Sequence, residues 1–272
     1  MDKYSVLMSL YIKEKPDYLK MSIDSMVKQT IIPDQIVIVK DGPLTNVLEE
    51  VLIAYQAKYP ELFYIVTSEK NLGLGLALNL GLRYCRNELV ARMDTDDISL
   101  SDRCERQLRA FDNDRDLAIV GTMVDEFYEN PREIIATRIV PTTHDEIYEF
   151  AKRRSGFNHP TVMFKKSIVL RCGAYSNLRR NQDVDLFGRM LFSGFKAKNL
   201  DSSLLLFRSN KALSKRRRSW ENTKSYISTI YKLWKMGYSS FGDYILVCIA
   251  QTIMFISPVV VQSWLYKNFL RK

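Results

Sequence analysis

The sequence is poor in the residues that build zinc sites and disulfide frameworks. It contains 4 cysteines and 2 histidines in 272 residues. No two cysteines form a C-x-x-C pair, and neither His144 nor His159 has a partner at the spacing of a zinc site. This excludes a zinc centre or a C-x-x-C redox centre. The cysteines are expected to be reduced and mostly buried, as in a cytosolic protein.

The sequence also lacks a secretion signal and a glycine-rich phosphate loop. The uncharged run 4–12 has no basic segment before it and no A-x-A-like cleavage site, so a buried first strand is expected there. Residues 9–12, at the end of this run, where a phosphate loop would begin, contain no glycine. The run 71–75 has two glycines, but Leu78 stands where the dinucleotide-binding pattern needs a third. A loop-to-helix turn with close backbone approach is the expected role of that run.

The composition is that of a globular protein, whereas the charge is concentrated at one end. Hydrophobic residues make up 46% and charged residues 26% of the chain, which argues against wholesale disorder. Residues 196–272 contain 14 Lys/Arg against 3 Asp/Glu, and residues 1–195 contain 26 against 28. A tail of net charge +11 (14 minus 3) on a near-neutral body indicates an anionic partner, either lipid head groups or nucleic acid.

Strand and helix patterns alternate through the front half of the chain. Apolar runs typical of buried strands cover 4–10, 35–40, 62–67 and 88–93, and helical patterns begin at Pro16 and cover 44–58 and 74–85. The alternation predicts an α/β fold with a doubly wound, mostly parallel sheet and helices on both faces. In the rear half a short strand over 161–164, a helix over 183–192 and an apolar run over 203–207 are expected.

Two groups of carboxylates are expected at one edge of this sheet. Asp41 ends the second strand, and Asp94, Asp96 and Asp97 follow the fourth. Ligands of doubly wound sheets bind beyond the carboxyl ends of the strands, where the strand order switches. Clustered carboxylates repel one another, so a hard divalent cation is their natural partner. As alternatives, the cluster could begin a helix, and Asp41 could belong to an ordinary strand-to-helix turn.

The rear half contains further polar candidates. Asp183 and Asp185 lie at the start of an expected helix, where acidic residues also complement the helix dipole. A carboxylate there could instead be the general base that removes a proton from an attacking hydroxyl. His159 precedes the short strand, and a lone histidine is usually structural.

The C-terminal part combines basic and apolar character. Four consecutive basic residues, 215–218, precede helical patterns, and the run 244–266 contains no charge over its 23 residues. This length could span a bilayer, but polar residues dilute the run and Pro258 divides it. An interfacial, monotopic attachment with Trp264 and Tyr266 at head-group level is expected. The alternatives are a buried helical pair and a subunit interface.

The sequence resembles bacterial family 2 glycosyltransferases of the GT-A fold, in particular the branch that builds O-antigen, capsule and exopolysaccharide repeat units. The matching stretches follow the family's order: 29–30, 33–42, 71–81, 88–103, 158–164, Gly173 with Tyr175, 182–189, 207–208 and the arginine run. The resemblance implies a catalytic domain over 1–212, with a nucleotide-sugar-binding half (1–100) and an acceptor-binding half (101–212). A basic, amphipathic helical extension over 213–272 would associate with the membrane.

The resemblance also implies a donor site. Asp41 would bind the uracil or ribose of a UDP-sugar. Asp94 and Asp96 would form the DxD motif, which holds Mn2+ or Mg2+ on the diphosphate, and Asp97 would assist. The first strand ends in Met-Ser-Leu-Tyr over 8–11 rather than in the family's common Pro-x-Tyr-Asn, so nucleoside contacts there are expected to differ.

Further roles follow from the second half of the family's pattern. Asp183 would be the catalytic base, and His159 and Arg208 would lie near the donor diphosphate or the acceptor. Gln182 stands where the family usually has Glu, so the assignment of the base rests on Asp183 alone, with Asp185 as the fallback.

The implied activity is an inverting transfer of a hexose, galactose or glucose, from a UDP-sugar to a lipid-linked acceptor such as GlcNAc-diphospho-undecaprenol. The enzyme would lie at the cytoplasmic face of the bacterial inner membrane, peripheral or monotopic, on anionic lipid. A sugar nucleotidyltransferase is the nearer alternative, disfavoured because no glycine follows the first strand. A nucleic-acid partner is not expected, since the sequence has no stacking motif or recognition helix to accompany its basic tail.

Overall fold

A nine-stranded sheet organises the residues that the computed structural model describes, 1–209 and 219–257. Its first four strands are mutually parallel: β1 (Tyr4–Leu10), β2 (Gln35–Asp41), β3 (Phe63–Ser68) and β4 (Leu89–Met93). They are connected by α1 (Pro16–Val27), α2 (Asn46–Lys58) and α3 (Leu74–Leu82). The spatial order β3-β2-β1-β4 places the switch in strand order between β1 and β4. This half has the expected doubly wound pattern.

The rest of the sheet is mixed, so the expectation of a mostly parallel sheet is wrong for the sheet as a whole. β8 (Met163–Lys165) runs antiparallel to both β4 and β6 (Leu117–Phe127), and β9 (Lys196–Arg208) is parallel to β6. The short strands β5 (Ile98–Ser99) and β7 (Ala136–Arg138) pair antiparallel with β9 and β6. Apolar runs reveal that a strand exists but not its direction, which depends on the end of the sheet that each connection reaches.

Helices cover both faces of the sheet, as expected. One face packs against α1, α2 and α4 (Arg103–Asn113), and the other packs against α3, α5 (His144–Ala151), α6 (Lys166–Arg171) and α7 (Gln182–Phe192). Side chains alternate along β1: Val6 and Met8 belong to the first core, whereas Leu7 belongs to the second. The sheet is therefore buried on both sides, as parallel sheets generally are.

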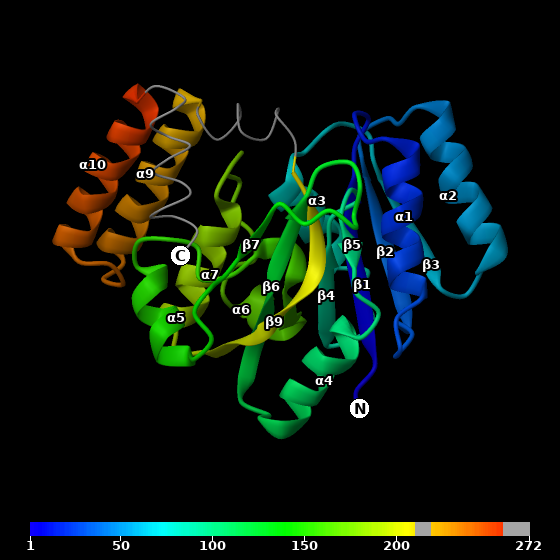
Figure 1. Cartoon of the computed structure of the whole chain (residues 1–272), viewed down its shortest axis with the longest axis horizontal. Helices are drawn as coiled ribbons and strands as arrows, with labels where there is room; N and C mark the ends of the chain where they lie inside the picture. The colour runs from blue at the N-terminus through cyan, green and yellow to red at the C-terminus, as the bar shows by residue number, and fades with distance from the viewer. Residues whose placement is uncertain (210–218, 258–272) are drawn as a thin grey trace.

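Two C-terminal helices, α9 (Trp220–Lys235) and α10 (Phe241–Ile256), pack on the α5–α7 side. Figure 1 shows this pair at one end of the molecule and α1 with α2 at the other, with the sheet between them. Gly188 of α7 allows close contact, because a Cβ there would lie 2.8 Å from a methyl carbon of Leu233. The Tyr238 hydroxyl donates to the Tyr148 carbonyl oxygen at 2.7 Å. The helical pair thus shares the core of the sheet domain.

Parts of the C-terminal expectations lie outside the described residues. These parts are the basic run 215–218, the predicted domain boundary at 212/213, Pro258, and the interfacial aromatics Trp264 and Tyr266. The uncharged run that begins at Tyr244 is helical as far as Ile256. Within the described ranges, none of the helices combines the length and apolar character needed to cross a bilayer.

Candidate functional site

The acidic cluster follows β4 at the switch in strand order. Asp94, Asp96 and Asp97 each offer a carboxylate oxygen, and these oxygens lie within 4.8 Å of one another. Adjacent elements fix the main chain of the cluster: the Ser22 hydroxyl of α1 donates to the Asp94 carbonyl oxygen at 2.6 Å, and Arg208 Nε donates to the Asp96 carbonyl oxygen at 2.9 Å. The cluster does not begin a helix, because β5 follows it directly and α4 begins only at Arg103.

Burial and mutual repulsion disfavour the charged forms of these carboxylates. Burial, together with the charges of Asp94 and Glu14, raises the pKa of Asp96 to about 7. Burial, together with Asp96 and Asp94, raises the pKa of Asp97 well above its ordinary value. Asp97 Oδ1 accepts a hydrogen bond from the Arg208 backbone N–H at 2.8 Å, whereas Oδ2 has no partner among the described residues. A divalent cation would relieve the repulsion and coordinate that oxygen, so this donor set fits a metal ion with oxygen ligands.

Arg208 is a buried anchor of the cluster. It is 4% exposed, and its guanidinium carbon lies 3.8 Å from the ring centroid of Tyr18 and 4.5 Å from that of Phe127. Contacts with two aromatic rings restrict the orientation of the guanidinium. The structure therefore places Arg208 beside the predicted diphosphate site, where its hydrogen bonds go to the main chain of Asp96 and the side chain of Asp97.

Asp41 holds the loop that leads into α3. Its Oδ1 accepts from the Leu72 N–H at 2.6 Å, and its Oδ2 accepts from the Gly73 N–H at 3.1 Å and from Asn71 Nδ2 at 3.0 Å. Gly42 makes this approach possible: its φ is +90°, and a Cβ on it would lie 2.9 Å from the Asn71 nitrogen. The close backbone approach expected of this loop is present, and the carboxylate of Asp41 fixes it.

The two acidic residues at the start of α7 have different surroundings. Burial raises the pKa of the Asp183 carboxyl, and the charges of Arg92 and Asp94 also act on it, so Asp183 lies within electrostatic reach of the cluster. Asp185 is 4% exposed and accepts hydrogen bonds from Ser176 Oγ at 2.5 Å and Arg189 Nη2 at 2.7 Å. Asp185 is thus occupied in tying α7 to the preceding loop.

His159 forms a hydrogen-bonded pair with a tyrosine that had no assigned role in the sequence. Its Nε2 lies 2.9 Å from Tyr175 Oη, and its ring packs edge-on against Phe187 with centroids 5.7 Å apart. Burial, together with the charge of Arg92, lowers the pKa of His159 well below its usual range. His159 is therefore a neutral hydrogen-bonding group at neutral pH rather than a cation.

Arg92 is the site residue that sequence reasoning missed. It lies in β4, is 1% exposed, and forms an ion pair with Asp94. Its charge acts on Asp96, Asp183 and the His159–Tyr175 pair. A signal was present in the sequence: an arginine inside a fully buried strand is uncommon unless it is paired.

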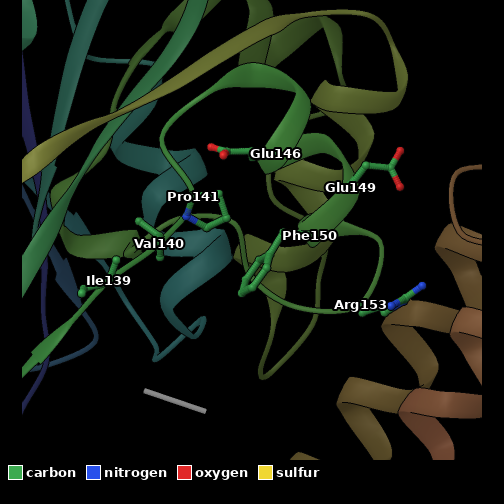
Figure 2. A pocket seen from close by; sticks show the side chains of 7 residues that line it. All are labelled: Ile139, Val140, Pro141, Glu146, Glu149, Phe150 and Arg153. Carbon is green, nitrogen blue, oxygen red and sulfur yellow. The ribbon is translucent and has the colours of Figure 1, made fainter. Parts of the chain in front are cut away.

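A hollow of about 530 Å³ lies elsewhere, between α5 and the segment 139–141 (Figure 2). Its charged groups are paired within the chain. Glu146 accepts from the Thr143 N–H at 3.2 Å, Glu149 pairs with Lys152 at 2.6 Å, and Arg153 pairs with Asp243. It therefore contains no group comparable to the acidic cluster.

The fold is that of glycosyltransferases. A structure of the mannosyltransferase PcManGT from Pyrobaculum calidifontis, in complex with GDP-Man and Mn2+, superposes with a TM-score of 0.66 at 14% identity. The superposition covers 98% of this chain and 79% of that one. The likeness shows a shared fold, in which this chain carries an acidic cluster at the switch point.

The chain belongs to glycosyl transferase family 2, whose family model matches residues 5–179. A UDP-Gal:alpha-D-GlcNAc-diphosphoundecaprenol beta-1,3-galactosyltransferase of Escherichia coli is 34% identical over 270 residues, which cover 99% of this chain and 97% of that protein. The amylovoran biosynthesis glycosyltransferase AmsE of Erwinia amylovora is 35% identical over 265 residues, which cover 97% and 98%. The chain is therefore a hexosyltransferase of the repeat-unit branch, as its sequence indicated.

Proposed function

We propose that this enzyme transfers galactose or glucose from a UDP-sugar to a lipid-linked acceptor such as GlcNAc-diphospho-undecaprenol, with inversion at the anomeric carbon. The observation that carries the proposal is the convergence of three carboxylates at the switch point. The charge of Asp94 also acts on the pKa of Asp183. The Escherichia coli relative, which matches this chain over almost its full length, supports the choice of donor and acceptor.

The donor diphosphate is bound through the acidic cluster. Asp94 and Asp96 hold Mn2+ or Mg2+, and Asp97 assists; Arg208 holds the main chain of Asp96 and the side chain of Asp97 in place. A bound divalent cation would stabilise the negative charge that develops on the leaving diphosphate. The uracil or ribose lies at the loop that Asp41 fixes, so that Asp41 positions the nucleoside site.

Asp183 deprotonates the acceptor hydroxyl as it attacks the anomeric carbon. Burial raises the pKa of Asp183, and a general base is more effective when its pKa is closer to neutral pH. The His159–Tyr175 pair is within electrostatic reach of this carboxylate, since the charge of Asp183 acts on the pKa of Tyr175, and it offers hydrogen-bonding groups to the acceptor or donor without adding charge.

The C-terminal helices attach the enzyme to the membrane that presents the acceptor. One side of α10 exposes large apolar residues, including Leu246 (50% exposed), Ile249 (53%), Ile253 (46%) and Ile256 (70%). Their spacing forms a stripe along the helix, as in interfacial helices. The basic tail adds attraction to anionic lipid of roughly 1 kcal/mol per nearby Lys or Arg. The enzyme thus acts as a peripheral or monotopic protein at the cytoplasmic face, with 213–272 as its membrane-binding extension.

A donor screen tests the reaction. The purified enzyme is incubated with Mn2+, a synthetic GlcNAc-diphosphate-lipid and one UDP-sugar at a time, and UDP release and the anomeric configuration of the product are measured. We expect acceptor-dependent UDP release with UDP-Gal or UDP-Glc, an inverted product, and loss of activity in EDTA. Release of pyrophosphate instead would identify a nucleotidyltransferase, and a retained configuration would overturn the role of Asp183.

A further inference from the structure

Arg92 is buried in β4, next to the acidic cluster, with which it shares an ion pair through Asp94. Its neighbours in β4, Val90, Ala91 and Met93, are all buried. Because side chains alternate along a strand, Arg92 shares the face of Val90, which packs against α3 and α7, whereas Ala91 and Met93 face the opposite core. The side chain of Arg92 therefore lies on the face of the sheet that α7, which begins at Gln182, helps to cover.

Only part of the hydrogen-bonding capacity of Arg92 is used. Its Nη2 pairs with Asp94 Oδ1, but its Nε and Nη1 atoms have no partner among the described residues. A guanidinium offers five N–H donors in a rigid fork, and leaving buried donors unpaired is costly. Such a group is kept in a protein when a ligand supplies the missing acceptors.

The surroundings of Arg92 indicate where that ligand lies. Asp94, at the proposed diphosphate site, forms an ion pair with Arg92. Asp183 and the His159–Tyr175 pair are within electrostatic reach of Arg92, because its charge acts on the pKa values of all three. The transferred sugar must lie between the leaving diphosphate and the base, because the acceptor attacks the carbon that carries the diphosphate. Arg92, whose Nε and Nη1 are buried and unpaired among the described residues, is thus close to the stretch that the sugar would occupy.

We propose that Arg92 binds the transferred hexose, donating its free N–H groups to hydroxyl or ring oxygens of the sugar, and that it contributes to the choice of donor. This inference rests on the proposed function. Sugar oxygens are neutral acceptors, and a charged donor gives them strong, directional hydrogen bonds. The competing role is that of a counter-ion, in which Arg92 only neutralises Asp94 and the diphosphate site.

The two roles differ in which ligand they affect. Replacement by lysine, Arg92→Lys, keeps a positive charge near Asp94 but removes the planar fork. If Arg92 binds the hexose, Arg92→Lys should weaken the binding of UDP-hexose by roughly tenfold to hundredfold, the loss expected for a charge-assisted hydrogen bond. The binding of UDP, which has no hexose, should change little. A counter-ion role predicts little loss for either ligand, because lysine keeps the charge.

The experiment is isothermal titration of wild type and Arg92→Lys with UDP and with UDP-hexose, each with Mn2+. A selective loss of UDP-hexose affinity supports the proposal, and a changed preference between UDP-Gal and UDP-Glc in kcat/KM would extend it to specificity. Equal losses for the two ligands, or no loss for either, would overturn it. If the proposed function itself is wrong, the result is different, because the wild-type enzyme would then bind neither UDP nor UDP-hexose.

Arg103 provides a matched control for damage to the fold. It is also a fully buried arginine with an unpaired Nε among the described residues, but its Nη1 donates to the carbonyl oxygens of Arg92 and Pro160 at 3.2 and 2.9 Å, and its Nη2 contacts the Met26 sulfur. It therefore supports the opposite side of β4. Arg103→Lys should lower the melting temperature while leaving the ratio of UDP-hexose to UDP affinity as in wild type. A ratio that falls equally in both variants would point to general distortion of the site and overturn the assignment to Arg92.

Discussion

Replacing Asp96 with asparagine should stabilise the metal-free protein at alkaline pH. The rise of the Asp96 pKa from 3.8 to about 7 corresponds to about 4 kcal/mol of unfavourable free energy in the ionised, folded form. Asp96 keeps partial contact with water, which screens its interaction with Asp94 and Glu14, so we expect roughly 1–2 kcal/mol to be recovered. For a protein of this size, this corresponds to an increase in Tm of roughly 2–8 °C.

The sign follows from proton linkage. Because the folded-state pKa of Asp96 is raised, its contribution to the stability of the folded protein is fully present below its unfolded pKa of 3.8. That stability is lost as the pH rises through about 7. The difference in Tm between Asp96→Asn and wild type should therefore be largest at pH values above 7 and shrink toward pH 4. Thermal melts in EDTA across this range measure it. Asp201→Asn, which removes an exposed carboxylate of β9, serves as the control.

Metal addition completes this test. Mn2+ should raise the Tm of wild type above pH 7, because a ligand that binds only the folded state stabilises it. The same addition should have much less effect on Asp96→Asn. The reasoning fails if Asp96→Asn melts at or below the wild-type temperature in EDTA above pH 7, or if Mn2+ stabilises both proteins equally.

Three further predictions concern the base, the membrane surface and the sheet. Asp183→Asn should reduce kcat by roughly 100-fold to 10,000-fold while UDP affinity is retained. In the wild-type pH profile of kcat/KM, the apparent pKa of the acid limb should lie above 3.8, the ordinary pKa of Asp, because burial raises the pKa of Asp183. Transfer that survives in Asp183→Asn but not in Asp185→Asn would reassign the base. Ile249→Lys should weaken the co-sedimentation of the protein with anionic vesicles, whereas Ile53→Lys, at a 63% exposed position on α2, should not. Equal effects of the two substitutions would contradict the proposal that α10 contacts the membrane. Gly81→Ala should destabilise the protein by about 1–3 kcal/mol in denaturant titrations, because its Cβ would lie 2.5 Å from side chains of β1 and β2, and unchanged stability would contradict that packing.

The edge strand β3 exposes Tyr64 and Thr67, but β1, β2 and β4 were predictable because their burial is almost continuous. Each lies between two layers of helices, so its apolar run stands out from the sequence. β9 was only partly visible: its second half contains the apolar run 203–207, but its first half alternates exposed Lys196 and Lys198 with buried Ala197 and Asn199. Strand direction in the rear half was not predictable, because it depends on connections that local patterns do not encode.

The candidate site shows a similar division. The acidic cluster could be located because its residues are adjacent in sequence and follow a strand. The part that Asp41 plays in holding a loop could not, because two of its partners are backbone N–H groups of residues 72 and 73, which carry no side-chain signature. The different surroundings of Asp183 and Asp185 also depend on distant partners, including Ser176 and Arg92.

The position of Arg208 links the acidic cluster to the C-terminal part of the chain. Arg208 fixes Asp96 and Asp97, it is the last residue of β9, and the chain continues from it toward the helices proposed to touch the membrane. If attachment to lipid shifts the end of β9, the affinity for the cation must change, and linkage then requires the cation to change the affinity for lipid by the same factor. Loading with donor and docking at the membrane would then be thermodynamically coupled through one side chain.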